Sequence, residues 1–338
     1  MNVAAGAFYA LGSGICNGLF TAPMKIIPRW KWEHIWLVFI VTACLIMPAA
    51  LVFSMTGDPR PVYAAAPAAA VRSALLFGFA WGFGAILFGL SVDSLGVSLA
   101  NSLVIGLSSA LGSVVPLIVQ GVLKFEARQI VLFAGVLVFV LGVALCGAAG
   151  RLREGVSSSR TIPARRLRLG YAFSSGSGIL SAIFNVGYSL ALPIADTGVR
   201  AGLTHFEATN TIWMLMLGAG SIPNIWFCAY LMRKNRNAGL FSGPSPHRTW
   251  GLSMAMGLLW GGSIFLYGLA TPQLGDIGPS IGWPLSLAAG LLVANLMGVL
   301  LGEWRHAPPA SLRLMRFGIG ALLAAICVCA YSTRIIEP

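Results

Sequence analysis

Charge is what this sequence lacks most. Only 9% of its 338 residues are Asp, Glu, Lys or Arg, whereas an ordinary soluble domain has about 25%. Acidic residues are the scarcer kind, with 10 Asp and Glu against 22 Lys and Arg. Hydrophobic residues make up 57% of the chain instead. This composition excludes an ordinary soluble globular domain and is typical of an integral membrane protein.

The charges are absent from ten long stretches of the chain. A helix that rises 1.5 Å per residue needs about 20 apolar residues to cross a hydrocarbon core of about 30 Å. The stretches cover residues 1–24, 34–57, 73–92, 94–123, 129–150, 169–195, 208–232, 249–275, 277–302 and 317–333. We therefore predict an all-α, polytopic membrane protein with ten transmembrane helices.

Catalytic and metal-binding patterns are missing too. The sequence contains no Gly-rich loop ending in Lys-Ser or Lys-Thr, the pattern that holds nucleotide phosphates. All six cysteines fall inside predicted spans, and none has a histidine at metal-ligand spacing. These absences predict no enzyme activity, no ATP-driven pumping, no metal site and no cofactor.

The basic residues are distributed unevenly between the loops. Of the 22 Lys and Arg, sixteen lie in the odd-numbered loops between spans, and six lie in the even-numbered loops and the C-terminal segment. Cytoplasmic loops carry an excess of Lys and Arg. We therefore expect the odd-numbered loops in the cytoplasm and both termini outside, in the plasma membrane (a bacterial inner membrane). The net charge of +12 then reflects topology and does not indicate a nucleic-acid partner.

The chain repeats itself after the fifth span. Gly78-Phe-Ala-Trp81-Gly82 in the third span matches Gly257-Leu-Leu-Trp260-Gly261 in the eighth, at an offset of 179 residues. Further matches pair residues 121–126 with 298–303 and residues 12–15 with 176–179. A five-span repeat has an odd number of crossings, so its two copies have opposite orientations, as in many secondary transporters. We predict two inverted five-helix repeats, 1–150 and 169–338, joined by a basic cytoplasmic connecting loop, 151–168.

Pairs of glycines four residues apart recur in these spans. Gly78 and Gly82 form one pair, and the other two pairs lie at positions 14 and 18 and at positions 257 and 261. Two small residues at this spacing lie on one helix face and allow a neighbouring helix to approach closely in lipid. We therefore predict helix–helix contacts at these glycines.

Neutral polar and aromatic side chains take the place of charge inside the spans. An amide offers a donor and an acceptor to neighbouring hydroxyls, and an indole face covers the apolar side of a sugar ring. An anionic cargo would need a cationic partner at depth, so we expect a neutral solute and, from these chemistries, a sugar. The candidate substrate-binding residues are Asn17, Trp81, Asn101, Asn185, Tyr188, Asn210, Trp260 and Trp283.

Five further tryptophans lie beside charged residues. This position is typical of side chains that anchor a helix at the membrane interface. The predicted interface anchors are Trp30, Trp32, Trp36, Trp250 and Trp304.

Several short motifs spread over residues 12–304 resemble one transporter family. They are Ala22-Pro23-Met24-Lys25 followed by Trp30-x-Trp32-Glu33-x-x-Trp36, then Trp81-Gly82, Gly178-Ile179-x-Ser181-Ala182-x-Phe184-Asn185, Ala208-Thr209-Asn210, Ser280-Ile281-Gly282-Trp283 and Gly302-Glu303-Trp304. The chain is similar in these motifs to the L-rhamnose/proton symporter family of the drug/metabolite transporter superfamily. The resemblance implies a ten-helix, five-plus-five fold and proton-driven uptake of a 6-deoxy sugar.

Proton coupling normally requires an ionisable group in the transport path. No predicted span has one at mid-depth, and the candidates near span ends are Glu33, Asp93, Asp276 and Glu303. Coupling to protons is therefore an expectation from the resemblance alone.

Three functions remain open from the sequence. The leading hypothesis is a secondary active importer of a neutral 6-deoxy sugar, with the sugar, the proton and the lipid bilayer as its partners. The second is an exporter of a neutral metabolite or drug from the same superfamily. The third is a membrane sugar sensor that binds without transport.

Overall fold

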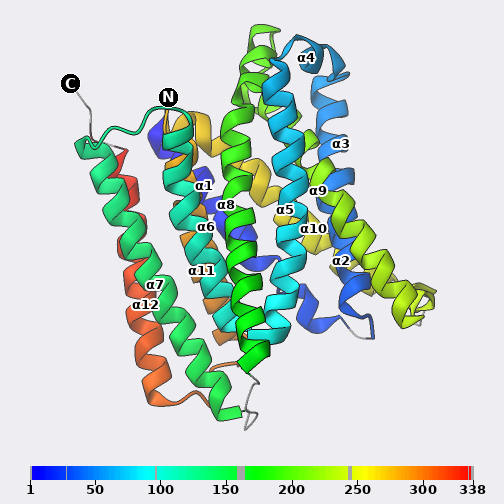
Figure 1. Cartoon of the computed structure of the whole chain (residues 1–338), viewed down its shortest axis with the longest axis vertical. Helices are drawn as coiled ribbons and strands as arrows, with labels where there is room; N and C mark the ends of the chain where they lie inside the picture. The colour runs from blue at the N-terminus through cyan, green and yellow to red at the C-terminus, as the bar shows by residue number, and fades with distance from the viewer. Residues whose placement is uncertain are drawn as a thin grey trace.

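The computed structural model describes residues 2–27, 29–95, 97–157, 164–242, 246–333 and 335, and these residues contain helices and no strand (Figure 1). The long helices are α1 (Val3–Leu19), α5 (Ala68–Leu95), α6 (Val97–Val119), α7 (Ala127–Ser157), α8 (Ala164–Arg200), α9 (His205–Asn235), α10 (Pro246–Gln273), α11 (Gly278–Leu300) and α12 (Pro309–Ser332). A composite second span joins α2 (Trp32–Val41), a π turn (Thr42–Ile46), α3 (Met47–Leu51) and a second π turn (Val52–Thr56). Short elements are α4 (Arg60–Ala65) and two 3₁₀ turns, Pro23–Ile26 and Ala238–Ser242.

The lengths and composition of these helices confirm the polytopic membrane fold. Within the described residues, nine helices are long and apolar enough to cross a membrane, the composite span Trp32–Thr56 among them. Helix α1 is apolar but has 17 residues, a rise of about 25 Å. It packs between α10 and α11 inside the bundle. Large apolar side chains on the outside of the bundle, such as Phe8, Leu137 and Phe317, are about 70% exposed, which suits a lipid-facing surface.

Two segments are more helical than the sequence suggested. The Ala- and Pro-rich stretch after the second span contains α4, and α5 already begins at Ala68. Helix α7 runs to Ser157 and α8 begins at Ala164, so both described ends of the predicted connecting loop 151–168 are helical. Residues 158–163 of that loop lie outside the described residues.

The bundle has two chemically different ends. At the end that we call the terminus end, the Asn2 backbone N–H at the start of α1 donates to Gln273 Oε1 at the end of α10 (2.8 Å), and α12 ends beside α7. At the opposite end, Trp30 before α2 donates to the Leu240 carbonyl after α9 (3.1 Å). We call this the basic end, because it carries Arg151, Arg153, Arg165, Arg166, Arg168, Arg233, Lys234 and Arg236 at the ends of α7, α8 and α9.

The paired glycines lie at close helix contacts, as predicted. A Cβ atom built at Gly78 of α5 would lie 2.7 Å from Met216 Cα of α9. One built at Gly257 of α10 would lie 2.9 Å from the Phe39 carbonyl oxygen of α2. Helices α5 and α10 thus use matching glycines to approach different partners. The inverted repeat itself stays a prediction.

Gly220 offers a test of this packing, because it faces the α5 glycines from α9. A Cβ at Gly220 would lie 2.6 Å from Trp81 Cε3 and 2.8 Å from the Gly78 carbonyl oxygen. Crowding of this kind costs about 1–3 kcal/mol. We expect Gly220→Ala to lower the melting temperature of the purified protein in detergent.

Gly218 on the same helix is the matched control, since no heavy atom lies within 4 Å of the Cβ that alanine would add there. Alanine gains up to about 1 kcal/mol over glycine in a helix interior, so Gly218→Ala should leave the melting temperature unchanged or raise it. Equal stability of the two variants would contradict the packing described above.

Candidate functional site

A cavity of about 240 Å³ lies inside the bundle. Its walls come from α1, α2, α5, α6, α8, α10 and α11. Among the described residues that line it there is no Asp, Glu, Lys, Arg or His. The cavity is therefore a neutral site with aromatic, hydroxyl and amide groups in its walls.

Two tryptophans form the aromatic centre of the cavity. Trp81 of α5 and Trp260 of α10 stack with ring centroids 5.2 Å apart and planes within 13° of each other. Phe184 of α8 packs on Trp81 with ring centroids 5.0 Å apart, and Phe39 of α2 packs on Trp260 in a T-shaped arrangement with centroids 5.8 Å apart. These are the tryptophans that the repeat aligned, and the fold brings them face to face.

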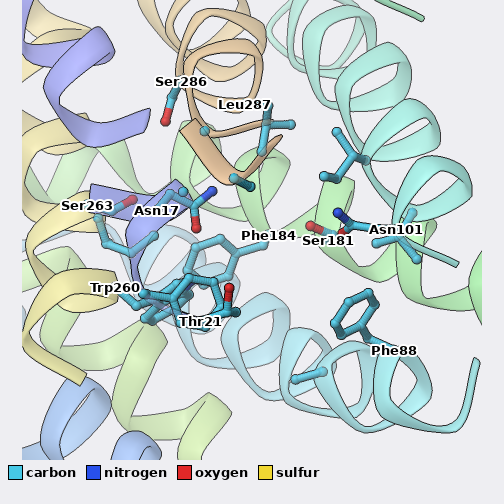
Figure 2. Close-up of a pocket in the computed structure, with 18 of the residues that line it drawn as sticks. Asn17, Thr21, Phe88, Asn101, Ser181, Phe184, Trp260, Ser263, Ser286 and Leu287 are labelled. Atoms are coloured by element: carbon cyan, nitrogen blue, oxygen red, sulfur yellow. The ribbon is translucent and has the colours of Figure 1, made fainter. Parts of the chain in front are cut away.

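Two asparagine amides reach the cavity from opposite sides (Figure 2). Asn17 comes from the last turns of α1 and Asn101 from the first turns of α6. No hydrogen bond within the described part of the chain ties down either amide. Thr21 lies beyond Asn17 on the same wall. Both amides are thus free to pair with hydroxyl groups of a solute.

A serine cluster was missed by the search for amides and indoles. Ser13 Oγ of α1 lies 2.7 Å from Ser286 Oγ of α11 and 3.3 Å from Ser263 Oγ of α10. All three side chains line the cavity. The signal was present in the repeat, because Ser13 matches Ser177, which also lines the cavity and donates to the Gly84 carbonyl at 2.8 Å.

Trp283 of α11 closes one edge of the cavity. Its indole Nε1 donates to the Ser108 carbonyl oxygen of α6 at 3.1 Å. Ser108 Oγ in turn donates to Ser181 Oγ of α8 at 3.0 Å. The Trp283 ring lines the site while its polar atom is used by the fold, so its contribution to a solute would be the ring alone.

Trp36 has a different place from the interface position that we predicted. It is 8% exposed, it lines the cavity, and its Nε1 donates to Asn224 Oδ1 of α9 at 3.0 Å. Trp304 is also buried, with the Arg153 guanidinium 4.6 Å from its ring centroid. The anchor interpretation is therefore wrong for both. A charged neighbour in the sequence does not determine whether an indole ring faces the lipid or the interior of the bundle.

Three predicted site residues do not line the cavity, and two of them, Asn185 and Tyr188, belong to a buried, hydrogen-bonded layer beside it. Asn185 of α8 donates to the Gly112 carbonyl (2.9 Å) and the Pro279 carbonyl (3.1 Å), and it accepts from the Tyr267 hydroxyl. Its amide is fully used by α6, α10 and α11. Tyr188 is also fully buried and hydrogen-bonded to Thr271 Oγ1. Asn210 is 1% exposed and is considered below.

The cavity lies in the middle of the bundle and in its basic half. Lining residues come from the last turns of α1, the first turns of α2 and α6, and the second half of α5. Tyr267 lines the cavity and forms, with Asn185 and Tyr188, a buried layer on the side toward the terminus end. We infer from this buried layer that access is closed at the terminus end.

The four candidate proton carriers occupy different environments. Glu33 is 5% exposed, Asp276 is exposed in the turn before α11, and Glu303 pairs with Arg153 at 3.1 Å. Helix α5 contains Asp93, whose side chain lies outside the described residues. Glu33 is thus the one buried carboxylate among the described side chains.

Polar groups from the end of α9 hold Glu33 in place. Its Oε1 accepts from Asn235 Nδ2 at 3.0 Å and from Asn237 Nδ2 at 2.6 Å. His34, which is fully buried, contacts the Asn237 carbonyl oxygen through Nε2 at 3.0 Å. This cluster joins α2 to α9 at the basic end, one turn before Trp36 in the cavity wall.

Comparison with known proteins supports a transporter. The family model described as L-rhamnose-proton symport protein (RhaT) matches residues 1–332. An L-rhamnose-proton symporter from Klebsiella pneumoniae (strain 342) is 26% identical over 332 residues, which is 95% of each chain. One from Escherichia coli (strain 55989 / EAEC) is also 26% identical over 332 residues and 95% of each chain.

The fold agrees with an independent structure. A solved structure described only as the crystal structure of a protein superposes with a TM-score of 0.62, at 13% identity and over 100% of both chains. That similarity bears on the fold alone. The match of the family model over nearly the whole chain bears on ancestry, and it shows that this protein belongs to the L-rhamnose-proton symport protein family, a family of multi-pass membrane transporters and not of enzymes.

Proposed function

We propose that this protein imports a neutral 6-deoxy sugar of the L-rhamnose type together with a proton. The observation that carries the proposal is the neutral cavity whose walls contain the stacked Trp81 and Trp260 together with the free amides of Asn17 and Asn101. Pockets for drug-sized ligands measure about 300–1,000 Å³, so a cavity of about 240 Å³ suits a single sugar ring.

The chemistry of the walls matches a deoxy sugar. Ring hydroxyls pair with amide and serine groups, and the apolar C–H face and the C6 methyl group fit against indole and phenyl rings. A phosphorylated or anionic solute would lack a cationic partner in the described walls. A neutral drug exporter would favour a wall of Phe, Leu and Met with every asparagine paired between helices, whereas Asn17 and Asn101 stay free.

Uptake by reconstituted vesicles tests the substrate. With an imposed pH gradient, acid outside, wild-type proteoliposomes should accumulate labelled L-rhamnose above the level of empty liposomes, and unlabelled 6-deoxy sugars should compete better than sugar phosphates. Saturable binding without accumulation at any gradient would favour the sensor. Failure of both binding and uptake would refute the sugar hypothesis.

We assign the proton to Glu33. This carboxylate is buried, it receives two amide N–H groups from the end of α9, and it lies one turn from the cavity wall at Trp36. The neighbouring titratable groups are His34 on the same helix and Cys228 on α9. Protonation removes the charge that both amides stabilise, and so weakens the tie between α2 and α9 at the basic end.

A charge-neutral variant tests this assignment. We expect Glu33→Gln to lose at least tenfold of the sugar accumulation driven by a pH gradient, while sugar-for-sugar exchange at equilibrium continues, because exchange needs no net proton movement. Asp276→Asn is the control, since it removes an equal charge from an exposed turn. Normal accumulation by Glu33→Gln would rule out Glu33 as the proton carrier.

We also propose that the two five-helix halves, 1–150 and 169–338, are inverted repeats and that both termini lie outside. The packing supports the repeat, because α1 packs on α11 as α8 packs on α6, and α5 packs on α9 as α10 packs on α2. The basic residues at the basic end support the orientation. In this orientation the described conformation is closed to the outside.

A further inference from the structure

The second and seventh spans share a short match that extends the repeat. Glu33-His34-Ile35-Trp36 begins α2, and Asn210-Thr211-Ile212-Trp213 lies near the start of α9, at an offset of 177 residues with Ile and Trp identical. The same offset relates residues 121–126 to 298–303. If the two segments are equivalent parts of a repeat, they must also pack against equivalent helices.

The glycine contacts show that they do. The glycine at position 257 of α10 meets the Phe39 carbonyl oxygen, and its repeat mate Gly78 meets the Met216 carbonyl oxygen. One turn further, Gly261 faces Ala43 while Gly82 faces Gly220. Both partner pairs, 39 with 216 and 43 with 220, differ by 177. The packing therefore makes Trp213 the spatial counterpart of Trp36.

The counterparts differ first in their access to the cavity. Trp36 forms part of the cavity wall. Trp213 is completely buried, stacked on Tyr188 at 4.3 Å with the planes within 9°, and on Phe184 at 5.8 Å. Thr21 and Asn185 are related by the same offset of 164 residues as the matching segments 12–15 and 176–179. They show the same difference, because Thr21 lines the cavity and Asn185 is buried in the closed layer.

The buried copy contains polar groups that the fold leaves unpaired. Asn210 is 1% exposed, and neither its Nδ2 nor its Oδ1 has a hydrogen-bond partner in the described part of the chain. Trp213 Nε1 is also without a partner there. By contrast, the counterparts Glu33 and Trp36 are both hydrogen-bonded. Buried unpaired amides are rare because they lose their water without compensation.

We propose that Asn210 and Trp213 form an outer contact site for the sugar, which is exposed when the bundle opens at the terminus end. During alternating access one repeat moves against the other around the substrate site. In the outward-open state, α9 would then line the cavity as α2 does in the conformation described here. The unpaired amide and indole N–H then meet sugar hydroxyls, the role proposed for the Asn17 amide in the cavity. This inference rests on the proposed function.

Kinetics measured from each face of the membrane test the site. Asn210→Ala and Trp213→Phe should raise the KM for L-rhamnose entering intact cells by about three- to tenfold, the factor for one or two neutral hydrogen bonds. The KM for L-rhamnose entering inside-out vesicles should stay within about twofold of wild type. Thr211→Val is the matched control, because the Thr211 hydroxyl is buried but already donates to the Ala208 carbonyl of its own helix. Equal KM changes from both faces would show a merely structural role and overturn the site.

Labelling provides a readout that does not depend on sugar flux. In a variant whose six native cysteines are replaced, Asn210→Cys should react with a membrane-impermeant maleimide added to intact cells, and L-rhamnose should slow the reaction. The proposal is contradicted if the cysteine at position 210 never reacts from outside. It is also contradicted if the cysteine reacts at a rate that L-rhamnose does not lower. Failure of the proposed function would give a different result from failure of the outer contact site. In that case cells expressing the wild-type protein would take up no L-rhamnose above background.

Discussion

Replacement of Trp260 with alanine is expected to raise the KM for L-rhamnose about thirtyfold or more. The Trp260 ring stacks on Trp81 in the cavity and packs on Phe39 in a T-shaped arrangement. Aromatic anchors that fill a buried site typically contribute about 2 kcal/mol or more to binding, and about 1.4 kcal/mol corresponds to a factor of ten. Alanine removes the ring face and also leaves Trp81 without its stacking partner.

Two variants make the Trp260 result specific. Trp260→Phe keeps an aromatic face of smaller area, so its KM should lie between those of wild type and Trp260→Ala. Trp226→Ala is the control, because Trp226 is 66% exposed and stacks on Tyr230 at the bundle surface, away from the cavity walls. Uptake kinetics in cells, corrected for the amount of protein in the membrane, provide the comparison. A wild-type KM for Trp260→Ala would remove the indole stack from the sugar site.

Asn185→Ala is expected to have the second large effect, on the rate of transport more than on sugar affinity. Asn185 joins α8 to α6, α10 and α11 through the Gly112 carbonyl, the Pro279 carbonyl and the Tyr267 hydroxyl. Each buried group left without a partner costs about 1–3 kcal/mol. The Tyr267 hydroxyl keeps the Pro279 carbonyl as its partner at 3.1 Å, so the Gly112 carbonyl is the group that loses its partner. The closed layer toward the terminus end therefore loses about 1–3 kcal/mol, and the equilibrium shifts toward the outward-open state.

The expected result for Asn185→Ala is a loss of about tenfold or more in maximal uptake rate, with faster maleimide labelling of a cysteine at position 210. Tyr267→Phe removes one hydroxyl from the same layer and should show a smaller loss of the same kind. The amount of each variant in the membrane should be measured, because a variant that does not reach the membrane has a folding defect and says nothing about the transport rate. Unchanged uptake and labelling would mean that this layer does not control access.

The sequence predicted the membrane fold well because burial in lipid is a simple physical constraint. A charge-free run of about 20 residues has few alternatives to a spanning helix, and small residues at a spacing of four allow close contact in lipid. Gly78 and Gly82 illustrate the second rule, since both face α9 directly. The start of α4 and the helical ends of the connecting loop were less predictable, because water-exposed segments are not constrained in this way.

The candidate site was predicted in part. Asn17, Trp81, Asn101, Trp260 and Trp283 line the cavity, while Asn185, Tyr188 and Asn210 lie outside it. The charge-free runs predicted which residues lie within the membrane. The direction of each side chain, however, depends on which helix packs against it. That information is absent from a single sequence, so an asparagine that joins helices and one that faces a cavity look the same.

The serines show a different limit of sequence reasoning. Ser13, Ser263 and Ser286 meet across three helices, and serine is too common in membrane helices to stand out. Its occurrence in the repeat at Ser13 and Ser177 was the available signal. A repeat match at a polar position therefore indicates a cavity residue, as the match at the tryptophans does.

Sugar-evoked proton movement tests the central claim most directly. Proteoliposomes containing the wild-type protein and an internal pH-sensitive dye should acidify inside when L-rhamnose is added outside at equal initial pH. Trp260→Ala should need far more sugar for the same response, and Glu33→Gln should give none. Saturable L-rhamnose entry with no internal acidification, or acidification that Trp260→Ala leaves unchanged, would contradict proton-coupled sugar transport through this cavity.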